Sequence, residues 1–177
     1  AKNFEMISYQ WSGRPDPDGN VYQIFKTSPG TSLNWSGISN PKLDAMLFPI
    51  QNDLSDLGAD LCVPDRGQKL EYEPLRMVDA QVKRLEQEID EMNAELKPLR
   101  SFVLPGGTPA AAALHMARTI SRRAERLVVA LAGEPNEPVG PAALKYINRL
   151  SDFLFVASRY VNDRGKSDVL WVPGQNR

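Results

Sequence analysis

Hydrophobic residues recur every three or four positions in four separate stretches of the chain, between residues 43 and 161. This spacing places side chains on one face of an α-helix, so each stretch predicts a helix with one buried side. Asn40-Pro41 is typical of a helix start, because a capping residue is followed by proline. The first predicted helix continues from there to about Leu61. Its apolar face consists of Leu43, Leu47, Ile50, Leu54 and Leu57.

Three further helices follow the same pattern. One is predicted from about Pro74 to Leu96, the next begins at Thr108-Pro109, and the last begins at Pro141. The apolar face of the first of these three consists of Val78, Val82, Leu85, Ile89, Met92 and Leu96. That of the second consists of Leu114, Ala117, Ile120, Ala124, Leu127, Val128 and Leu131. That of the third consists of Leu144, Ile147, Leu150, Leu154, Ala157 and Val161.

Four helices joined by short loops that contain proline and glycine predict an all-α fold, an antiparallel helical bundle. The segment before the bundle has a different composition. Residues 1–40 are rich in Gly, Pro, Ser and Asn, which predicts an irregular segment with short strands around residues 4–11 and 21–25. After the last helix, residues 168–173 are expected to be extended.

Composition narrows the classes of function. A chain of 177 residues fits one domain, and its formal net charge of −1 gives no general attraction to nucleic acid or to anionic membranes. The single cysteine, Cys62, excludes a disulfide within the chain and favours a reducing compartment. No apolar run approaches the length of a membrane span and no secretion signal opens the sequence, so we expect a cytoplasmic protein. The single histidine, His115, has no ligand-spaced partners, so we expect a packing histidine with satisfied hydrogen bonds and no metal site.

The candidate chemistry is concentrated in the last two helices. Arg118, Arg122, Glu125 and Arg126 recur at four, seven and eight residues and therefore share one helical face. Arginine is planar, permanently charged and binds phosphate oxygens in pairs, so this face is a candidate polyphosphate site. The alternative is a solvated charged surface, or a set of salt bridges between helices.

Two further features are open to a functional and a structural interpretation. Asn148 lies beside the core position Ile147, where its amide needs a partner, either in a ligand site or in an ordinary polar network. In the loop 102–107, Phe102 precedes two glycines that let the backbone approach a ligand or a neighbouring subunit. The alternative for this loop is a connector whose aromatic residue plugs the end of the bundle.

Three motifs together resemble a known family. They are F-V-L-P-G-G-T at residues 102–108, L-H-M-A-R-T-I-S-R-R-A-E-R at 114–126 and Y-I-N-R-L-S-D-F-L-F-V-A-S-R-Y at 146–160. The combination is similar to the ATP:cob(I)alamin adenosyltransferases of the propanediol-utilisation type, and the likeness covers about residues 43–177. Members of that family are trimeric five-helix bundles that bind ATP between subunits. The resemblance therefore implies a homotrimer.

The resemblance also implies an activity, which is transfer of the 5′-deoxyadenosyl group of ATP to the cobalt of cob(I)alamin with release of triphosphate. Magnesium would accompany ATP, a flavin-dependent reductase would supply electrons, and an adenosylcobalamin-dependent mutase would receive the product. Arg122 on the phosphates and Phe102 on the cobalamin face are the implied catalytic residues, and Arg118 would form a salt bridge across the subunit interface. The implied ATP contacts are Arg122, Arg123, Glu125, Arg126 and Asn148.

The chain departs from the family at its start. The glycine-rich T-R-T-G-D-x-G-T type segment and the first helix of the family have no counterpart. Residues 1–45 instead resemble a fragment of an oligopeptide ABC-transporter solute-binding protein. We therefore predict an atypical N-terminal segment, 1–42, and an adenosyltransferase bundle, 43–177. Two functions stay open, which are an adenosyltransferase with an impaired rate and an inactive bundle that acts as a corrinoid-binding or oligomeric scaffold.

Overall fold

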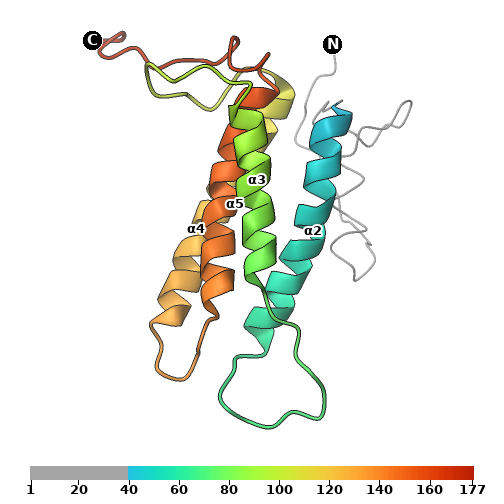
Figure 1. Cartoon of the computed structure of the whole chain (residues 1–177). Coiled ribbons are helices and arrows are strands. Elements are labelled where there is room, and N and C mark those ends of the chain that lie inside the picture. Colours follow the sequence, from blue (N-terminus) through green and yellow to red (C-terminus); the bar gives the residue numbers. More distant parts are fainter. Residues whose placement is uncertain (1–39) are drawn as a thin grey trace, which may run out of the picture.

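Four long helices form the described part of the chain, residues 40–177, in this computed structural model. They are α2 (Pro41–Cys62), α3 (Asp79–Asn93), α4 (Pro109–Ala132) and α5 (Pro141–Tyr160). Consecutive helices run in opposite directions along a common axis (Figure 1). The predicted all-α antiparallel bundle is therefore confirmed. The short strands expected in residues 4–11 and 21–25 lie outside the described residues, as does nearly all of segment 1–45, for which a resemblance to a solute-binding protein was only an expectation.

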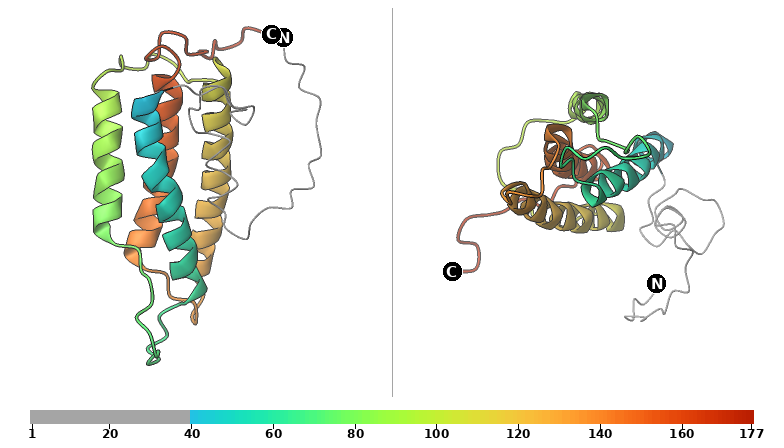
Figure 2. Two further views of the ribbon diagram at one scale, coloured as in Figure 1. Left: turned by 90° about the vertical axis from the view of Figure 1, so that its right-hand side faces the viewer. Right: turned by 90° about the horizontal axis from the view of Figure 1, so that it is seen from below.

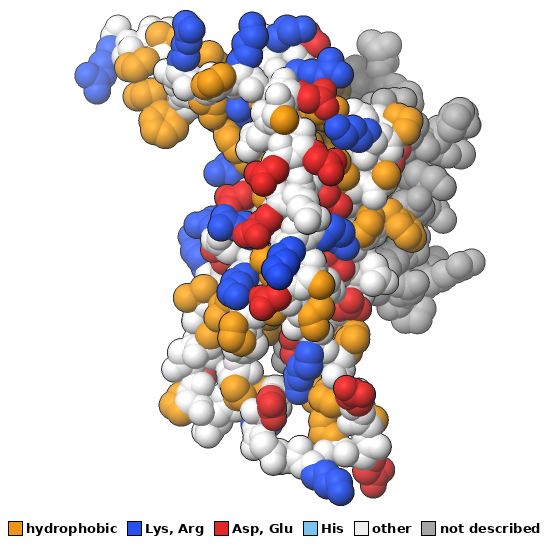
Figure 3. All heavy atoms as spheres, in the orientation of Figure 1, with side chains coloured by type: hydrophobic (Ala, Val, Ile, Leu, Met, Phe, Trp, Pro, Cys, Tyr) orange, Lys and Arg blue, Asp and Glu red, His pale blue; other side chains and the backbone are white. Residues whose placement is uncertain are grey.

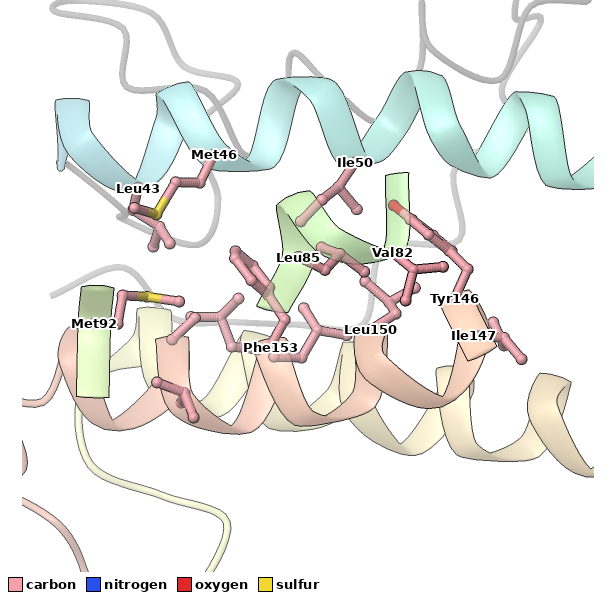
Figure 4. Close-up of a cluster of buried hydrophobic side chains, with 14 of the residues drawn as sticks. Leu43, Met46, Ile50, Val82, Leu85, Met92, Tyr146, Ile147, Leu150 and Phe153 are labelled. Carbon is pink, nitrogen blue, oxygen red and sulfur yellow. The ribbon is translucent and has the colours of Figure 1, made fainter. Parts of the chain in front are cut away.

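Helix α5 is the centre of the bundle. It contacts each of the other three helices, and Figure 2 shows it surrounded by them. Tyr146, Leu150 and Phe153 of α5 are fully buried and meet Ile50 of α2 and Leu85 of α3 in the cluster of Figure 4. Burying an aromatic or leucine side chain contributes roughly 1.5–3 kcal/mol to folding, so this cluster supplies much of the stability. The apolar face predicted for the last helix is confirmed at four positions, Ile147, Leu150, Leu154 and Ala157.

The predicted helix starts at Asn40 and Thr108 are confirmed. The side chain of Asn40 accepts a hydrogen bond from Leu43 N at 3.2 Å, and that of Thr108 accepts one from Ala111 N at 3.2 Å. Each cap satisfies an N–H group that has no partner inside the helix, and a proline follows each cap at the first helical position.

The prediction for α3 was too long at both ends. The helix begins at Asp79 rather than near Pro74 and ends at Asn93 rather than Leu96. Residues before Asp79 are held by the buried carboxylate of Asp60, which accepts hydrogen bonds from Met77 N at 2.9 Å and from the Arg76 guanidinium at 2.7 Å. This long-range contact keeps the segment extended, so the local helix signal at Pro74 is overridden.

The predicted buried face of α4 is only partly correct. Leu114 and Val128 are buried, whereas Ile120 is 61% exposed and Leu127 is 64% exposed. Helix α4 packs mainly against α5, and Ile120 and Leu127 remain exposed in the single chain. The hydrophobic pattern of α4 therefore describes two faces, one in the core and one on the surface of the single chain.

The expected extended tail pairs with the loop before α4. Leu104 N donates to Val169 O at 2.7 Å, and Trp171 N donates to Phe102 O at 2.8 Å, around an antiparallel bridge between Val103 and Leu170. The two segments lie side by side at the end of the bundle where α5 finishes (Figure 1).

Candidate active site

Glu125 of α4 brings together three of the residues that the sequence predicts for an anion site. Its Oε2 atom lies 2.5 Å from Nη1 of Arg122 one turn earlier on the same helix. Its Oε1 atom accepts a hydrogen bond from Nδ2 of Asn148 on α5 at 2.8 Å. Asn148 is exposed, so its amide does not require a protein partner, although Glu125 provides one. The contact between Asn148 and Glu125 is compatible both with a ligand site and with an ordinary polar network between α4 and α5.

Two predicted ATP contacts lie outside this network. Arg123 and Arg126 are exposed, and neither forms an ion pair with any residue in the range 40–177. Helix α4 therefore carries four arginines and one glutamate between residues 118 and 126, and its outer surface here is strongly positive. Such a surface attracts polyanions, and its exposed guanidinium groups are available to bind them.

Arg118 lies one turn from Arg122 but in different surroundings. Its guanidinium carbon is 5.2 Å from the centroid of the Phe155 ring on α5, which is the geometry of a cation–π contact. Arg118 and Phe155 line one pocket together with Phe102 and Trp171. No carboxylate partner of Arg118 lies in the described part of the chain, so the salt bridge implied by the resemblance stays a prediction.

Phe102 projects from the surface and does not plug the bundle. Its side chain is 74% exposed, which contradicts the structural alternative for the loop 102–107. Its ring meets that of Trp171 edge-on, with 5.8 Å between centroids and 60° between planes. In Figure 3, hydrophobic side chains gather at the upper left over this loop and the C-terminal tail, and basic side chains lie around them. We call the pocket of Phe102, Arg118, Phe155 and Trp171 the aromatic pocket.

The aromatic pocket and the arginine–glutamate network are neighbours along α4. Arg118 belongs to the pocket and Arg122 to the network, and four residues of helix separate them by roughly 6 Å of rise. A ligand with a flat apolar part and a polyanion could therefore be bound side by side on this face. This arrangement suits a reaction between a large planar molecule and a phosphate ester.

His115 is buried as predicted but its hydrogen bonds are not satisfied. Its ring packs edge-on against Phe155 at 6.3 Å, and neither ring nitrogen finds a partner within residues 40–177. Burial, followed by the charge of Arg118, lowers the pKa of His115, so the ring is neutral at pH 7. The expectation of a satisfied packing histidine is therefore correct in its packing and wrong in its hydrogen bonds.

Phe155 and Trp171 are candidate site residues that the sequence analysis missed. Phe155 stands in a helix beside the core positions Leu154 and Ala157, and Trp171 stands in a tail without periodicity. The only available signal was the apolar run Val169–Val172 around Trp171 after the last helix. Their association with Phe102 depends on contacts between residues more than fifty positions apart, which a local pattern cannot reveal.

Residues 40–177 contain neither a cluster of metal-ligating side chains nor a helix suited to spanning a membrane. No group of three or more His, Cys, Asp or Glu side chains there is placed to hold a metal ion. Glu125 is engaged by Arg122 and Asn148 and is not a free ligand. In the same range, no helix is long and apolar enough to cross a bilayer.

Comparison with known proteins identifies relatives over most of the chain. Residues 28–161 match the family model described as cobalamin adenosyltransferase. A corrinoid adenosyltransferase of Mycobacterium tuberculosis (strain ATCC 25618 / H37Rv) is 47% identical over 141 residues, which cover 80% of this chain and 72% of the relative. The corrinoid adenosyltransferase of Bacillus subtilis (strain 168) is 44% identical over 128 residues, covering 72% of this chain and 63% of the relative.

Solved structures give the same result for the fold. A variant of the PduO-type ATP:corrinoid adenosyltransferase from Lactobacillus reuteri, complexed with cobalamin and ATP, superposes with a TM-score of 0.63 at 37% sequence identity. The superposition covers 77% of this chain and 75% of that chain. A second variant from the same organism, complexed with ATP, gives a TM-score of 0.64 at 37% identity, with 77% of each chain covered.

Proposed function

The chain belongs to the cobalamin adenosyltransferase family, and from this premise we propose which residues carry its activity. The reaction moves the 5′-deoxyadenosyl group of ATP to the cobalt of cob(I)alamin. The observation that supports a site on α4 is the adjacency of two unlike surfaces. The arginine–glutamate network and the aromatic pocket lie one helical turn apart, where a triphosphate and a corrinoid could be held next to each other.

In the proposed reaction, cob(I)alamin is the substrate that supplies the electron pair. A cobalt–carbon bond forms to C5′ of the ribose, the carbon–oxygen bond to the triphosphate breaks, and triphosphate leaves with the electrons of that bond. The protein's part is to align the two substrates and to stabilise the charge of the leaving group. Arg122, Arg123 and Arg126 carry the charge that this step requires, and Asn148 and Glu125 orient Arg122.

Phe102 has a separate proposed role. Its exposed ring on the rim of the aromatic pocket is placed to press against the flat face of a corrinoid. Occupying that face displaces a lower axial ligand and makes the cobalt easier to reduce. An exposed phenylalanine that moved freely could not hold this position against the corrinoid. The contact with the ring of Trp171 restricts the movement of Phe102 and so supports this role.

The proposed active form is a homotrimer with ATP between subunits, in which Arg118 forms a salt bridge to a neighbouring subunit. The exposed apolar residues of α4 support this proposal. Met116, Ile120 and Leu127 follow one another at helical spacing and lie on the same helix as the four arginines. An exposed apolar stripe of this kind is typical of a protein interface. Arg123 lies on the same face, three residues after Ile120 and four before Leu127, so a subunit seated there would approach one of the proposed ATP contacts.

Further partners follow from the chemistry of the proposed reaction. The described residues offer no cage for a metal ion, so magnesium is proposed only as an ion carried by the triphosphate of ATP, and no step is assigned to it. A flavin-dependent reductase would keep cobalt in its low oxidation state. An adenosylcobalamin-dependent mutase would take up the product. We also place the protein in the cytoplasm, because its single cysteine favours a reducing compartment.

The alternative is an inactive bundle that binds corrinoid or serves as an oligomeric scaffold, and the comparisons lend it no support. One assay separates the two functions. The protein is mixed with ATP, magnesium and chemically reduced cobalamin, and the absorbance change that accompanies cobalt–carbon bond formation is followed. We expect turnover, and we expect Arg122→Ala to reduce it by roughly 100-fold, which is about 3 kcal/mol in the transition state. Corrinoid binding without turnover would favour the scaffold.

The matched control for this variant is Arg66→Ala. Arg66 forms an ion pair with Glu137 at 2.5 Å, with a similar exposure to that of Arg122, but the two residues lie in the loops after α2 and after α4, outside the proposed site. Loss of that pair changes stability by no more than about 1 kcal/mol, so turnover should be unchanged. Equal losses in the two variants would mean that the charge on α4 has no special role.

A further inference from the structure

A buried polar cluster closes the end of α5, outside the residues proposed to bind ATP or corrinoid. Nε of Arg159 donates to Oδ2 of Asp168 at 2.8 Å, and the two side chains are only 8% and 2% exposed. Nη2 of Arg159 also donates to the carbonyl of Lys97 at 2.9 Å. Removing two charges from water is expensive, so a buried ion pair is weak evidence for a gain in stability. Its position suggests a different use.

Asn162 extends this cluster to the loop before α4. The side chain is fully buried, its Oδ1 accepts from Thr108 N at 2.9 Å, and its Nδ2 donates to Gly106 O at 3.2 Å. Between these two contacts, Gly107 has φ +97°, and a Cβ atom there would lie 2.4 Å from the amide of Asn162. Only glycine fits, so the loop and the asparagine are closely matched. We call Arg159, Asn162 and Asp168 the C-terminal latch.

The C-terminal latch fixes the segment that carries Phe102 at both ends. Arg159 holds it at Lys97, and Asn162 holds it at residues 106–108. Asp168, in turn, anchors the start of the tail that leads to Trp171. Between the fixed ends, the backbones of Phe102 and Trp171 are joined by a hydrogen bond of 2.8 Å. The backbone segments that carry both aromatic residues are therefore tied to the three polar side chains of the latch.

We propose that the C-terminal latch positions Phe102 and Trp171 in the aromatic pocket for contact with the corrinoid. This inference rests on the proposed function of Phe102, because without a corrinoid the position of that ring has no consequence for the reaction. The latch residues are positioning residues and touch no substrate themselves. An exposed aromatic side chain on a loop can act on a substrate only if the supporting backbone is fixed, and a small displacement of such a group is costly.

The first test measures the position of the tail without any substrate. Trp171 becomes the sole tryptophan in the double variant Trp11→Phe, Trp35→Phe, and its quenching by acrylamide is recorded. In that background, Asp168→Asn keeps the side-chain shape but removes the charge that Arg159 requires. We expect the quenching constant of Trp171 to rise about twofold as the tail is released from the pocket. Unchanged quenching would overturn the proposal.

The matched control is Asp163→Asn. Asp163 stands in the same turn and forms an ion pair with Lys166 at 3.5 Å, but both side chains are more than 60% exposed. Its substitution should leave the quenching of Trp171 and the rate of adenosylation unchanged. If Asp168→Asn does not fold, Gly107→Ala disturbs the latch from the other side and takes its place in both tests.

The second test measures adenosylation and separates the latch from the proposed function. We expect Asp168→Asn to lower kcat by about tenfold to a hundredfold with KM for ATP unchanged, because none of the proposed ATP residues belongs to the latch. In a Phe102→Ala background, Asp168→Asn should cause no further loss. Additive losses, or increased quenching with a normal rate, would overturn the proposal. If Phe102→Ala alone leaves the rate unchanged, the role proposed for Phe102 fails, whereas the quenching result still decides whether the latch holds the tail.

Discussion

Asn148 on α5 donates a hydrogen bond to the carboxylate of Glu125 on α4, with 2.8 Å between Nδ2 and Oε1. The second oxygen of that carboxylate binds Nη1 of Arg122. One planar group therefore fixes two side chains from different helices relative to each other. Glu125 engages a single nitrogen of the guanidinium, so the remaining N–H groups of Arg122 are available to an anion. Glu125 orients the arginine without blocking it.

The first prediction concerns Glu125→Gln. Glutamine keeps the shape and can still accept from Asn148, but it loses the ion pair with Arg122. We expect KM for ATP to rise and kcat to fall, together by about tenfold, which is less than the loss of a direct phosphate contact. Unfolding by urea should shift by less than about 1 kcal/mol, because the pair lies within one helix and the Arg122 side chain is 50% exposed, although that of Glu125 is 12% exposed. Wild-type kinetics in this variant would contradict the role of Glu125, and Glu137→Gln is its control.

A second prediction concerns Phe102→Ala. Because the ring is 74% exposed, its removal should change the free energy of unfolding by less than about 1 kcal/mol. ATP binding should be retained, since the arginines of α4 are untouched. Adenosylation should become slower when cob(II)alamin is supplied under reducing conditions, because the lower ligand of cobalt is no longer displaced. Calorimetric titration measures ATP binding, and the absorbance assay measures the rate of adenosylation. An unchanged rate with cob(II)alamin would refute the role of Phe102.

The helices could be predicted because their signals are local. The spacing of Leu43, Ile50 and Leu57 has the period of a helix, and the caps at Asn40 and Thr108 lie within four residues of the groups that they satisfy. The start of α3 was misplaced because it depends on Asp60, which contacts the backbone of a residue seventeen positions later. Local signals fail where a long-range polar contact decides the conformation.

The candidate site was predictable in part for the same reason. Arg122 and Glu125 share a face by helical spacing alone, and the structure places them in contact. Ile120 has the same spacing signal as a core residue, and no sequence pattern distinguishes a face that meets the core from one left on the surface. The pairing of Phe102 with Trp171 carries no spacing signal, because two irregular segments meet only after the bundle has formed.

A third prediction concerns the pH dependence of stability and arises from Glu88 on α3. Burial raises the pKa of Glu88 from 4.5 to about 7. The charge of Arg84 opposes this rise only in part, because Arg84 forms an ion pair with Asp53 at 2.5 Å and approaches Glu88 only to 3.5 Å. The nearby charges of Glu91 and Asp53 act in the same direction as burial. Between pH 4.5 and about 7, the folded chain keeps a proton on Glu88 that the unfolded chain releases. The free energy of unfolding should therefore fall as the pH rises through that window.

Urea denaturation of the wild type and of Glu88→Gln at pH 5, 6, 7 and 8 measures this effect. The neutral variant should gain stability relative to the wild type as the pH rises, by about 1–3 kcal/mol between the ends of the series, and level off above pH 7. His115 acts with the opposite sign, because burial lowers its pKa and its contribution is lost on acidification. His115 is present in both proteins, so its contribution cancels when the free energy of unfolding of the wild type is subtracted from that of Glu88→Gln at each pH. A constant difference across the series would contradict the raised pKa of Glu88.

The last prediction concerns the exposed apolar stripe of α4 and the proposed trimer. Leu127 is 64% exposed in the single chain, so Leu127→Glu places a charge where water already reaches and glutamate is a good helix former. We expect unchanged helix content by circular dichroism but a shift from trimer to monomer in sedimentation equilibrium, because a buried unpaired charge is costly at an interface. Turnover should be lost with the trimer, since the proposed ATP site lies between subunits.

Leu75→Glu is the control for that prediction. Leu75 is also exposed, but it lies in the connection before α3, away from α4. A trimer that survives in this variant and dissociates in Leu127→Glu assigns the interface to α4. Dissociation in both variants would point to a general effect of added negative charge. A wild-type protein that is monomeric at a concentration where it is fully active would separate catalysis from assembly, and the arginines of α4 would then have to bind ATP within a single chain.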